Sequence, residues 1–296
     1  MSRRTARRRV LRITVPAGPA ATDGNGGQAA LSERADVLAV EEPLGIRIDG
    51  QAVSLTMRTP GDDIDLTAGF LVSEGIARAA ADIITIRICD GERCGHQHDA
   101  DDPDSVGNIA DVTLRPGIAV RPQARRNFMT TSACGVCGKA SISDLRVPGI
   151  FELSRDQVRV SAAMLAGLPD ALRQAQRVFD RTGGLHAAGL FAADASLLAV
   201  REDVGRHNAV DKVIGWALRS GRLPLSGCVL LVSGRASFEL VQKAVLAGIP
   251  VLAAVSAPSS LAAELAEDAG LTLVGFLRGG SMNVYAGGHR ISPWPS

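Results

Sequence analysis

Two cysteines separated by two residues are the part of this chain best suited to chemistry. Cys134 and Cys137 lie in the run Thr-Ser-Ala-Cys-Gly-Val-Cys-Gly-Lys, among hydroxyls, glycines and a lysine. A C-x-x-C pair brings its sulfurs close enough to form a disulfide, to hand over a persulfide sulfur or to supply half of a tetrahedral metal site. The spacing alone does not separate these chemistries, so the rest of the chain has to decide between them.

Three interpretations of the pair compete. A thioredoxin-type redox pair follows a strand and begins a helix, whereas this pair follows basic chain without a regular pattern. A structural zinc site needs two more ligands, which only one other cluster could supply. That cluster comprises Cys89, Cys94, His96 and His98. A nucleophilic sulfur carrier needs a thiolate whose pKa is lowered by amides or cations, on a loop that reaches a donor and an acceptor, and the neighbouring glycines and Lys139 suit this case.

Bulk composition narrows the class of protein. With 296 residues, 46% of them hydrophobic, the chain can bury two modest cores, so two domains are expected. A formal net charge of +1 gives no global field for a nucleic-acid backbone, which disfavours nucleic acid as the main ligand. Five cysteines do not form a secreted disulfide framework, and no segment has the roughly 18 uncharged apolar residues of a membrane span. We therefore expect a soluble, cytoplasmic protein.

The first half predicts a tail, a small domain and a linker. Residues 1–32 combine an arginine cluster with proline and glycine, which predicts a disordered tail; an RNA-binding arm is disfavoured because no aromatic residue is interleaved. Residues 33–120 predict a small α+β domain, with a hairpin turn at Asp49-Gly50 and a helix capped by Asp62. Residues 121–150 then form a linker that carries the cysteine pair.

Residues 151–296 predict an α/β domain, because short apolar strands alternate with helices. Helices are expected at 168–179, 209–218, 239–247 and 261–269, and strands at 188–191, 197–200, 229–232, 251–255 and 271–276. Fully apolar strands indicate a largely parallel sheet that is covered on both faces, which is a three-layer α/β/α architecture.

Three loops should meet at the edge of this sheet where the strands end. Residues 233–237, 256–260 and 278–281 offer hydroxyls, glycines and helix starts, and the first and third carry an arginine. Each loop by itself reads as an ordinary turn with a helix N-cap. Their repetition at one edge favours a ligand that bears phosphate, because such ligands bind beyond the carboxyl ends of strands.

The charged run at residues 201–212 also falls at a junction between a strand and a helix. Its sequence is Arg-Glu-Asp-Val-Gly-Arg-His-Asn-Ala-Val-Asp-Lys. A solvated helix start with internal ion pairs explains it as well as the polar floor of an active site does. Cys228, in contrast, opens an apolar strand and is expected to be a buried structural residue.

Four blocks in this order resemble the formate dehydrogenase accessory sulfurtransferases, the FdhD family. They are the cysteine motif at 131–139, the charged run at 202–212, Ser-Gly-Arg-Ala-Ser-Phe-Glu at 233–239 and the closing Gly-Phe-Leu-Arg-Gly-Gly-Ser-Met-Asn-Val-Tyr at 275–285. The resemblance extends from about residue 39 to residue 291. Four matching blocks are far more specific than the C-x-x-C pair alone.

The resemblance implies a sulfur carrier. Such a protein takes persulfide sulfur from a cysteine desulfurase and transfers it to the molybdenum of bis(molybdopterin guanine dinucleotide), which formate dehydrogenase requires. It also implies a cytidine-deaminase-like fold for the second half and a homodimer. Zinc-dependent deamination itself is rejected, because the H-x-E signature is missing and no proline precedes the C-x-x-C pair. No permanently bound metal is predicted.

The same resemblance assigns roles to particular residues. Cys134 corresponds to the cysteine that carries the persulfide, and Cys137 is expected to assist or to resolve it. The closing segment corresponds to the part that binds the cofactor; it comprises Phe276, Leu277, Arg278, Gly279, Gly280 and Ser281. The main alternative is a zinc-stabilised module that binds a nucleotide or cofactor without covalent sulfur transfer. Dithiol redox regulation is a third possibility.

Overall fold

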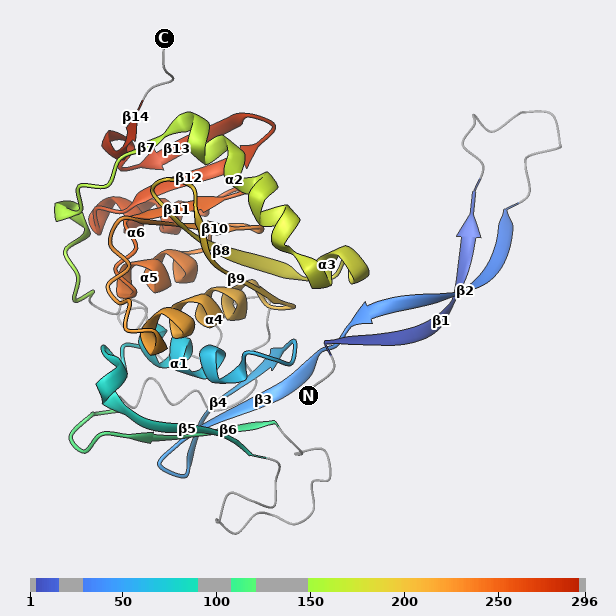
Figure 1. The fold of residues 1–296 in the computed structure, drawn as a ribbon, viewed down its shortest axis with the longest axis horizontal. Coiled ribbons are helices and arrows are strands. Elements are labelled where there is room, and N and C mark those ends of the chain that lie inside the picture. Colours follow the sequence, from blue (N-terminus) through green and yellow to red (C-terminus); the bar gives the residue numbers. More distant parts are fainter. Residues whose placement is uncertain (1–3, 16–28, 90–107, 121–148, 293–296) are drawn as a thin grey trace.

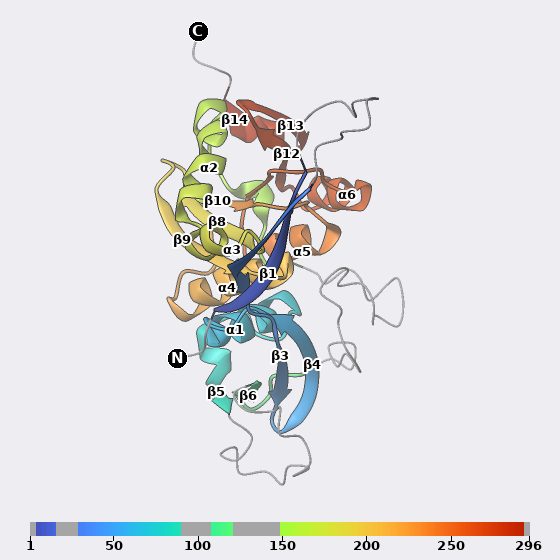
Figure 2. The ribbon, with the colours of Figure 1, turned by 90° about the vertical axis from the view of Figure 1, so that its right-hand side faces the viewer.

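The computed structural model describes residues 4–15, 29–89, 108–120 and 149–292. Two sheets lie one above the other with helices between them, and a two-stranded ribbon extends from one side (Figures 1 and 2). The structure is therefore mixed α/β, as the sequence predicts. None of the helices in these residues is long and apolar enough to cross a membrane.

The larger sheet has six strands in the order β13-β12-β11-β10-β8-β9. Their bounds are β8 His186–Ala192, β9 Leu197–Asp203, β10 Cys228–Val232, β11 Val251–Ala254, β12 Thr272–Arg278 and β13 Ser281–Ala286. Only β10, β11 and β12 run parallel to one another; β8, β9 and β13 join by antiparallel pairing. The prediction of a largely parallel sheet was wrong here, because both edges are completed by hairpins.

Helices cover both faces of this sheet. On one face, α2 (Ala162–Ala175) buries Leu165, Leu168 and Leu172 against the strands. The opposite face packs against α4 (Arg206–Arg219), α5 (Phe238–Leu246) and α6 (Ser260–Asp268). Successive strand residues point to opposite faces, which is why a strand buried between two helical layers has to be apolar throughout. The cytidine-deaminase-like assignment of this arrangement stays a prediction.

The helix expected at 168–179 begins earlier and is divided in two. Helix α2 starts after Ser161, whose hydroxyl accepts a hydrogen bond from the Met164 amide at 3.0 Å. Pro169 lies inside α2, so the proline does not mark the beginning of the helix. A second helix, α3 (Arg177–Thr182), follows directly. The Ser161 hydroxyl indicates the start of α2 better than the apolar pattern does, because it accepts a hydrogen bond from an amide that the first turn leaves unpaired.

The smaller sheet has four strands in the order β4-β3-β6-β5. They are β3 Glu42–Ile48, β4 Gln51–Arg58, β5 Ile83–Cys89 and β6 Ile109–Leu114. The antiparallel pairing of β3 with β4 confirms the hairpin at Asp49-Gly50. Helix α1 (Asp63–Ser73) covers one face of this sheet with Leu66, Phe70 and Leu71. Its N-cap Asp62 makes no side-chain cap and instead pairs with Arg4 at 2.7 Å.

Helices α1 and α4 join the two sheets through a contact that two glycines make possible. A Cβ built on Gly69 would lie 1.8 Å from the Asp211 carbonyl oxygen, and one built on Gly215 would lie 1.8 Å from the Asp65 carbonyl oxygen. Only a residue without a side chain allows the two backbones to approach this closely. The two halves of the chain are therefore packed directly against each other, and Ala68 and Val72 of α1 belong to the same core cluster as the apolar residues of α4.

A buried ion pair strengthens the same junction. Lys212 on α4 lies 2.7 Å from a carboxylate oxygen of Asp203, and both side chains are at most 1% exposed. The Lys212 ammonium also donates to the Thr59 carbonyl at 2.8 Å, and the Thr59 amide donates to Asp203 at 3.1 Å. Thr59 follows β4 of the smaller sheet, so this network ties one half of the chain to the other.

Replacing Lys212 with methionine should destabilise the protein by about 3–5 kcal/mol, because it leaves the Asp203 carboxylate buried without its cation. The measurement is the free energy of unfolding in urea. Arg155→Met is the matched control, since Arg155 pairs with Glu152 at the surface, and its loss should cost less than about 1 kcal/mol. Equal, small losses in both variants would contradict this account of the junction.

The N-terminal segment differs from the disordered tail expected for residues 1–32. Strand β1 (Thr5–Thr14) pairs antiparallel with β2 (Ala30–Ala39) to form a two-stranded ribbon. Residues 1–32 were expected to be disordered because they combine an arginine cluster with proline and glycine, but Leu11 and Ile13 alternate with Arg12 and Thr14 as in a strand. The pairing satisfies backbone groups that a tail would leave to water.

Candidate functional site

The three predicted loops meet at one edge of the six-stranded sheet. The Ala236 amide donates to the Ala257 carbonyl at 3.2 Å, and the Ser259 amide donates to the Ala236 carbonyl at 3.0 Å, which joins the loops after β10 and β11. The Phe276 amide donates to the Ser256 carbonyl at 3.1 Å and joins the end of β12 to them. The edge is thus a connected backbone surface, with the helix starts of α5 and α6 behind it.

Residues 276–281 form the end of the β12–β13 hairpin rather than a loop after a final strand. Arg278 is paired with Ser281, and Gly279 and Gly280 between them have φ angles of 57° and 76°. A two-residue turn with both φ angles positive has the twist that a hairpin needs, and glycine adopts it without strain. The hairpin projects Arg278 and two exposed glycine amides from the sheet edge.

A bulge in β12 positions this hairpin. The register shifts between Gly275 and Arg278, and Phe276 has a φ of 51° in the left-handed region. This conformation turns the Phe276 amide away from β13 and toward Ser256. The Arg278 guanidinium then lies 5.6 Å from the centre of the Phe276 ring. Bulges commonly re-aim side chains near functional sites, and this one fixes an arginine at the sheet edge.

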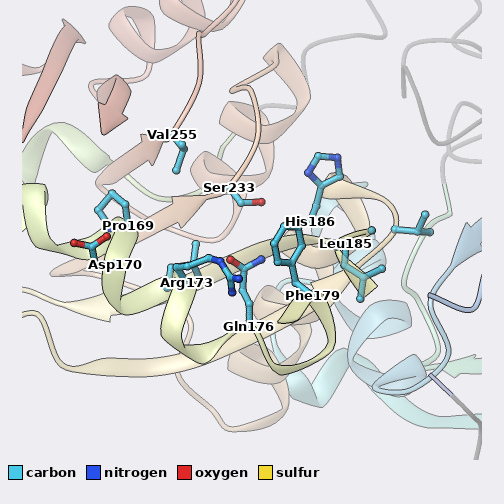
Figure 3. A pocket seen from close by; sticks show the side chains of 13 residues that line it. Pro169, Asp170, Arg173, Gln176, Phe179, Leu185, His186, Ser233 and Val255 are labelled. Carbon is cyan, nitrogen blue, oxygen red and sulfur yellow. The ribbon is translucent and has the colours of Figure 1, made fainter. Parts of the chain in front are cut away.

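A pocket of about 660 Å³ opens at the same edge (Figure 3). Its sheet side is formed by the ends of strands and by Ser233 and Val255, and its other side by α2, α3 and the chain after them. The lining residues are Pro169, Asp170, Leu172, Arg173, Gln176, Phe179, Gly183, Gly184, Leu185, His186, Val204, Ser233 and Val255. A pocket of this size accommodates a small organic ligand.

The helical side of the pocket combines an aromatic ring with polar groups. The Arg173 guanidinium lies 4.8 Å from the centre of the Phe179 ring and also pairs with Asp180. Gln176, between α2 and α3, is only 4% exposed. Figure 3 shows Arg173, Gln176 and Phe179 together on this side. A ring for stacking, an amide and charged groups are what a site for a planar heterocycle contains.

His186 is the titratable ring of the pocket. It begins β8 and lies opposite Asp203 in the β8–β9 pair. Burial lowers its pKa below the ordinary value of 6.5, and the positive charge of nearby Arg206 adds to this effect. The ring is therefore neutral at pH 7 and is able to accept a hydrogen bond from a ligand.

The lowered pKa predicts a specific pH dependence. Between the pKa of unfolded histidine, about 6.5, and that of native His186, the unfolded state binds more protons, so stability falls as pH is lowered through this window. An NMR titration of the imidazole resonances should find a midpoint below 6.5 that disappears in His186→Asn. The variant should also lose stability less steeply on acidification. A midpoint at or above 6.5 for His186 would contradict the burial argument.

Part of the charged run at 201–212 is buried between the two halves of the chain, and His207 faces a loop at the sheet edge. Asp203, Asn208, Asp211 and Lys212 are buried at the junction of the two halves. For these four residues the structure bears out neither the solvated helix start nor the active-site floor, because each of them makes a hydrogen bond to the smaller half of the chain. His207 instead faces the loop after β10, where its Nε2 lies 3.1 Å from the Ser237 hydroxyl and 3.0 Å from a Glu239 carboxylate oxygen. This explains why Ser237, the N-cap of α5, makes no side-chain cap.

The predicted site residues are only partly within the described chain. Cys134 and Cys137 lie outside it, as do Cys94, His96 and His98. Cys89 ends β5 and is disulfide-bonded. Residues 276–281 are at the expected sheet edge, but none of them lines the 660 Å³ pocket. The roles of the two cysteines and of the hairpin stay predictions.

The structure confirms the prediction that Cys228 is a buried structural residue. It opens β10, is 9% exposed and is a free thiol. Burial raises the pKa of this thiol, and Asp156 nearby acts in the same direction. A protonated, buried thiol is a poor nucleophile, so Cys228 is suited to packing and not to sulfur chemistry.

Sequence reasoning missed the residues that line the pocket. His186, Gln176 and Phe179 belong to no recognised motif: His186 begins β8, Gln176 lies between α2 and α3, and Phe179 lies on α3. One signal was available: Gly183-Gly184, two residues before His186, marks a turn just ahead of the strand that His186 begins.

Comparison with known proteins identifies the family. The model of the FdhD/NarQ family matches residues 39–292. Proteins named "Sulfur carrier protein FdhD" are 56% identical in Nocardia farcinica, over 97% of this chain and 95% of that one, and 55% identical in Streptomyces avermitilis, over 99% and 97%. A crystal structure of a putative formate dehydrogenase accessory protein from Desulfotalea psychrophila has the same fold, with a TM-score of 0.67 and 23% identity over 96% of this chain and 99% of that one. The chain belongs to the FdhD/NarQ family.

Proposed function

We propose that this chain is a sulfur carrier that accepts persulfide sulfur from a cysteine desulfurase and delivers it to bis(molybdopterin guanine dinucleotide) for formate dehydrogenase. The observation that carries the proposal is the Cys134-x-x-Cys137 pair in a chain 55–56% identical to proteins named sulfur carriers. The connected, phosphate-type loops at one sheet edge support a ligand of this kind.

Sulfur is received when the Cys134 thiolate attacks the outer sulfur of the donor's persulfide. The donor's S–S bond breaks, the donor cysteine leaves as a thiolate, and Cys134 holds the sulfane sulfur. Sulfur is released when the Cys137 thiolate attacks Sγ of Cys134. The terminal sulfur then leaves as sulfide with the electron pair, and the two cysteines are oxidised to a disulfide. This second step gives Cys137 its resolving role, and an external reductant of the thiol class restores the pair.

The acceptor is bound at the carboxyl edge of the six-stranded sheet. Exposed amides of Gly279 and Gly280 and the Arg278 guanidinium suit a pyrophosphate, since main-chain amides and arginine forks are the usual donors to phosphate oxygens. Phe276, Leu277 and Ser281 complete the segment; Leu277 is buried and anchors the hairpin. The nearby pocket, with Phe179 and Gln176, suits a planar base.

The same proposal includes the partners, the compartment, the oligomeric state and the architecture of the larger domain. The donor is a cysteine desulfurase and the recipient is formate dehydrogenase. The protein acts in the cytoplasm as a homodimer, without nucleic acid, and its larger domain has a cytidine-deaminase-like architecture. The strand order with an antiparallel β8–β9 edge beside three parallel strands supports the last point.

Persulfide mapping tests the proposal. The protein is incubated with a desulfurase and ³⁵S-labelled cysteine, and labelled peptides are then located by mass spectrometry. The label is expected on the peptide that contains Cys134. Label on Cys228 alone, or no label on any cysteine, would reject the sulfur-carrier assignment.

Arg278→Gln should weaken the binding of guanosine diphosphate, which carries the base and pyrophosphate of the acceptor. The loss of a charged hydrogen-bond donor predicts a Kd about 10- to 100-fold higher. Isothermal titration calorimetry measures it, and Arg159→Gln, an exposed arginine before α2, serves as the control with an unchanged Kd. An unchanged Kd in both variants would remove the hairpin from the binding site.

The alternative function is a zinc-stabilised module that binds the cofactor without covalent chemistry. It would be favoured if purified protein held stoichiometric zinc, if activity were lost with the metal and if Cys134→Ala alone had no effect. Dithiol redox regulation would instead make both cysteines equally important, and the protein would never retain sulfur.

A further inference from the structure

The β1–β2 ribbon extends beyond the rest of the protein. Ten residues of β1 pair with ten residues of β2, so the ribbon is roughly 33 Å long. Figure 1 shows its far end well away from both sheets, and Figure 2 views the same ribbon in front of them. Neither strand pairs with a third strand in the described part of the chain. An isolated two-stranded ribbon is at best marginally stable in water.

One side of the ribbon is apolar toward its far end. Leu11 and Ile13 are each 60% exposed, and Leu31, opposite Ile13, is 64% exposed. Residues two apart and residues directly opposite share one side of a ribbon, so these three side chains form a single apolar surface. We call Leu11, Ile13 and Leu31 the apolar side. The other side at the same level is polar, with Arg12 opposite Ser32.

Among the residues that the structure describes, the protein's own body covers only the near end of this side. Ala39 at the end of β2 lies on the same side by register, and its Cβ is 3.7 Å from the position of a Cβ on Gly184. Helix α3 contacts β2 there. The side that packs against the body carries Arg7 and Arg9 in its middle and becomes aliphatic at its far end. These exposed aliphatic side chains indicate that a second molecule covers the far end.

We propose that a second copy of this chain covers the apolar side, with the two ribbons exchanged between the copies. A two-fold interface uses the same patch on both copies, so the patch must complement itself. This side meets that condition, because Arg9 and Glu33 flank the aliphatic residues and supply both members of an ion pair. Reciprocal exchange brings 20 strand residues from each copy, which matches the about 20–30 residues per side of a standard interface.

Charge complementarity supports the same partner. Five of the 32 basic residues and two of the 31 acidic residues lie in β1 and β2, so the ribbon has an excess of three positive charges and the rest of the chain an excess of two negative charges. A nucleic acid would also attract these arginines, but it would not cover aliphatic side chains, and the ribbon contains no aromatic residue for stacking.

Sedimentation velocity of the full chain tests the proposal, which rests on the homodimer of the proposed function. Ile13→Lys with Leu31→Lys places two charges on the apolar side. Thr14→Lys with Ser32→Lys adds the same charge beside them on the opposite side and is the matched control. The first pair should raise the dimer Kd at least about 100-fold, because each buried lysine loses its water. The control should change it less than about threefold.

If the lysine variant fails to fold, a photo-crosslinker tests whether a second copy contacts the apolar side. Benzoylphenylalanine at position 13 should yield crosslinks to a second copy, whereas the same group at position 12 should not. Three results would overturn the proposal: a monomeric wild-type protein at tens of micromolar, a dimer unchanged by the apolar-side pair, or nucleic acid retained by a monomer through the ribbon arginines. Loading of sulfur on Cys134 is measured in parallel, and its failure would count against the sulfur carrier alone.

Discussion

Cys134→Ala should lower the sulfur-dependent activation of formate dehydrogenase by about 1,000-fold or more. The reason is that the variant lacks the only atom proposed to hold the sulfane sulfur, and removing a nucleophile typically costs several orders of magnitude in rate. Activation is measured by adding the variant, a desulfurase and cysteine to formate dehydrogenase matured without the carrier. The labelled persulfide should be absent from the variant in the same samples.

Two controls separate this role from a general need for thiols. Cys228→Ala should activate normally, because Cys228 is a buried thiol with a raised pKa. Cys137→Ala should still accept the label on Cys134 but release it slowly, since sulfide release needs an attacking thiolate. If Cys134→Ala activates formate dehydrogenase to the wild-type level, covalent sulfur transfer through this residue is excluded and the zinc-stabilised alternative gains support.

Gly69→Ala should destabilise the protein by about 3–5 kcal/mol, because the methyl group has no room between α1 and α4. The added Cβ would lie 1.8 Å from the Asp211 carbonyl oxygen, a backbone atom that cannot rotate away. Helices α1 and α4 would have to separate, which would open the shared core and the Lys212–Asp203 network. The free energy of unfolding in urea gives the measurement.

Gly167→Ala provides the opposite expectation in the same assay. Gly167 lies inside α2 with no atom within 4 Å of a built Cβ, so alanine should stabilise the helix by about 0.5–1 kcal/mol. The difference between the two variants isolates the close helix contact from the general effect of removing a glycine. A Gly69→Ala variant that is as stable as the wild type would show that α1 and α4 do not meet as described.

Much of the core could be predicted from the sequence because its strands are short and uniformly apolar. Each helix and strand expected between residues 186 and 278 is present within a few residues of its predicted bounds. The two-stranded ribbon and the edge strand β13 were harder to predict. Strands β1 and β2 carry arginines and pair with each other across an intervening segment, and β13 pairs with β12 through a tight turn, which local patterns do not reveal.

The candidate site, like the fold, could be predicted only in part. The three loops could be placed at one edge because parallel strands end together, and their backbone hydrogen bonds follow from that geometry. The pocket could not be predicted, because it is formed between the sheet and α2–α3, and His186 becomes part of it only through tertiary packing. Asp203 and Lys212 show the converse: the sequence left a solvated helix start and an active-site floor equally open for them, and the structure places them in a buried network between the two halves of the protein.

The absence of any gap between α1 and α4 also restricts how this protein can move. Two helices whose main chains are in contact can neither slide past each other nor rotate apart about a hinge without breaking many contacts at once. Both sheets should therefore move as one rigid block, with a constant spacing between the hairpin at residues 276–281 and the smaller sheet. A ligand at this edge of the sheet is then met by a fixed surface.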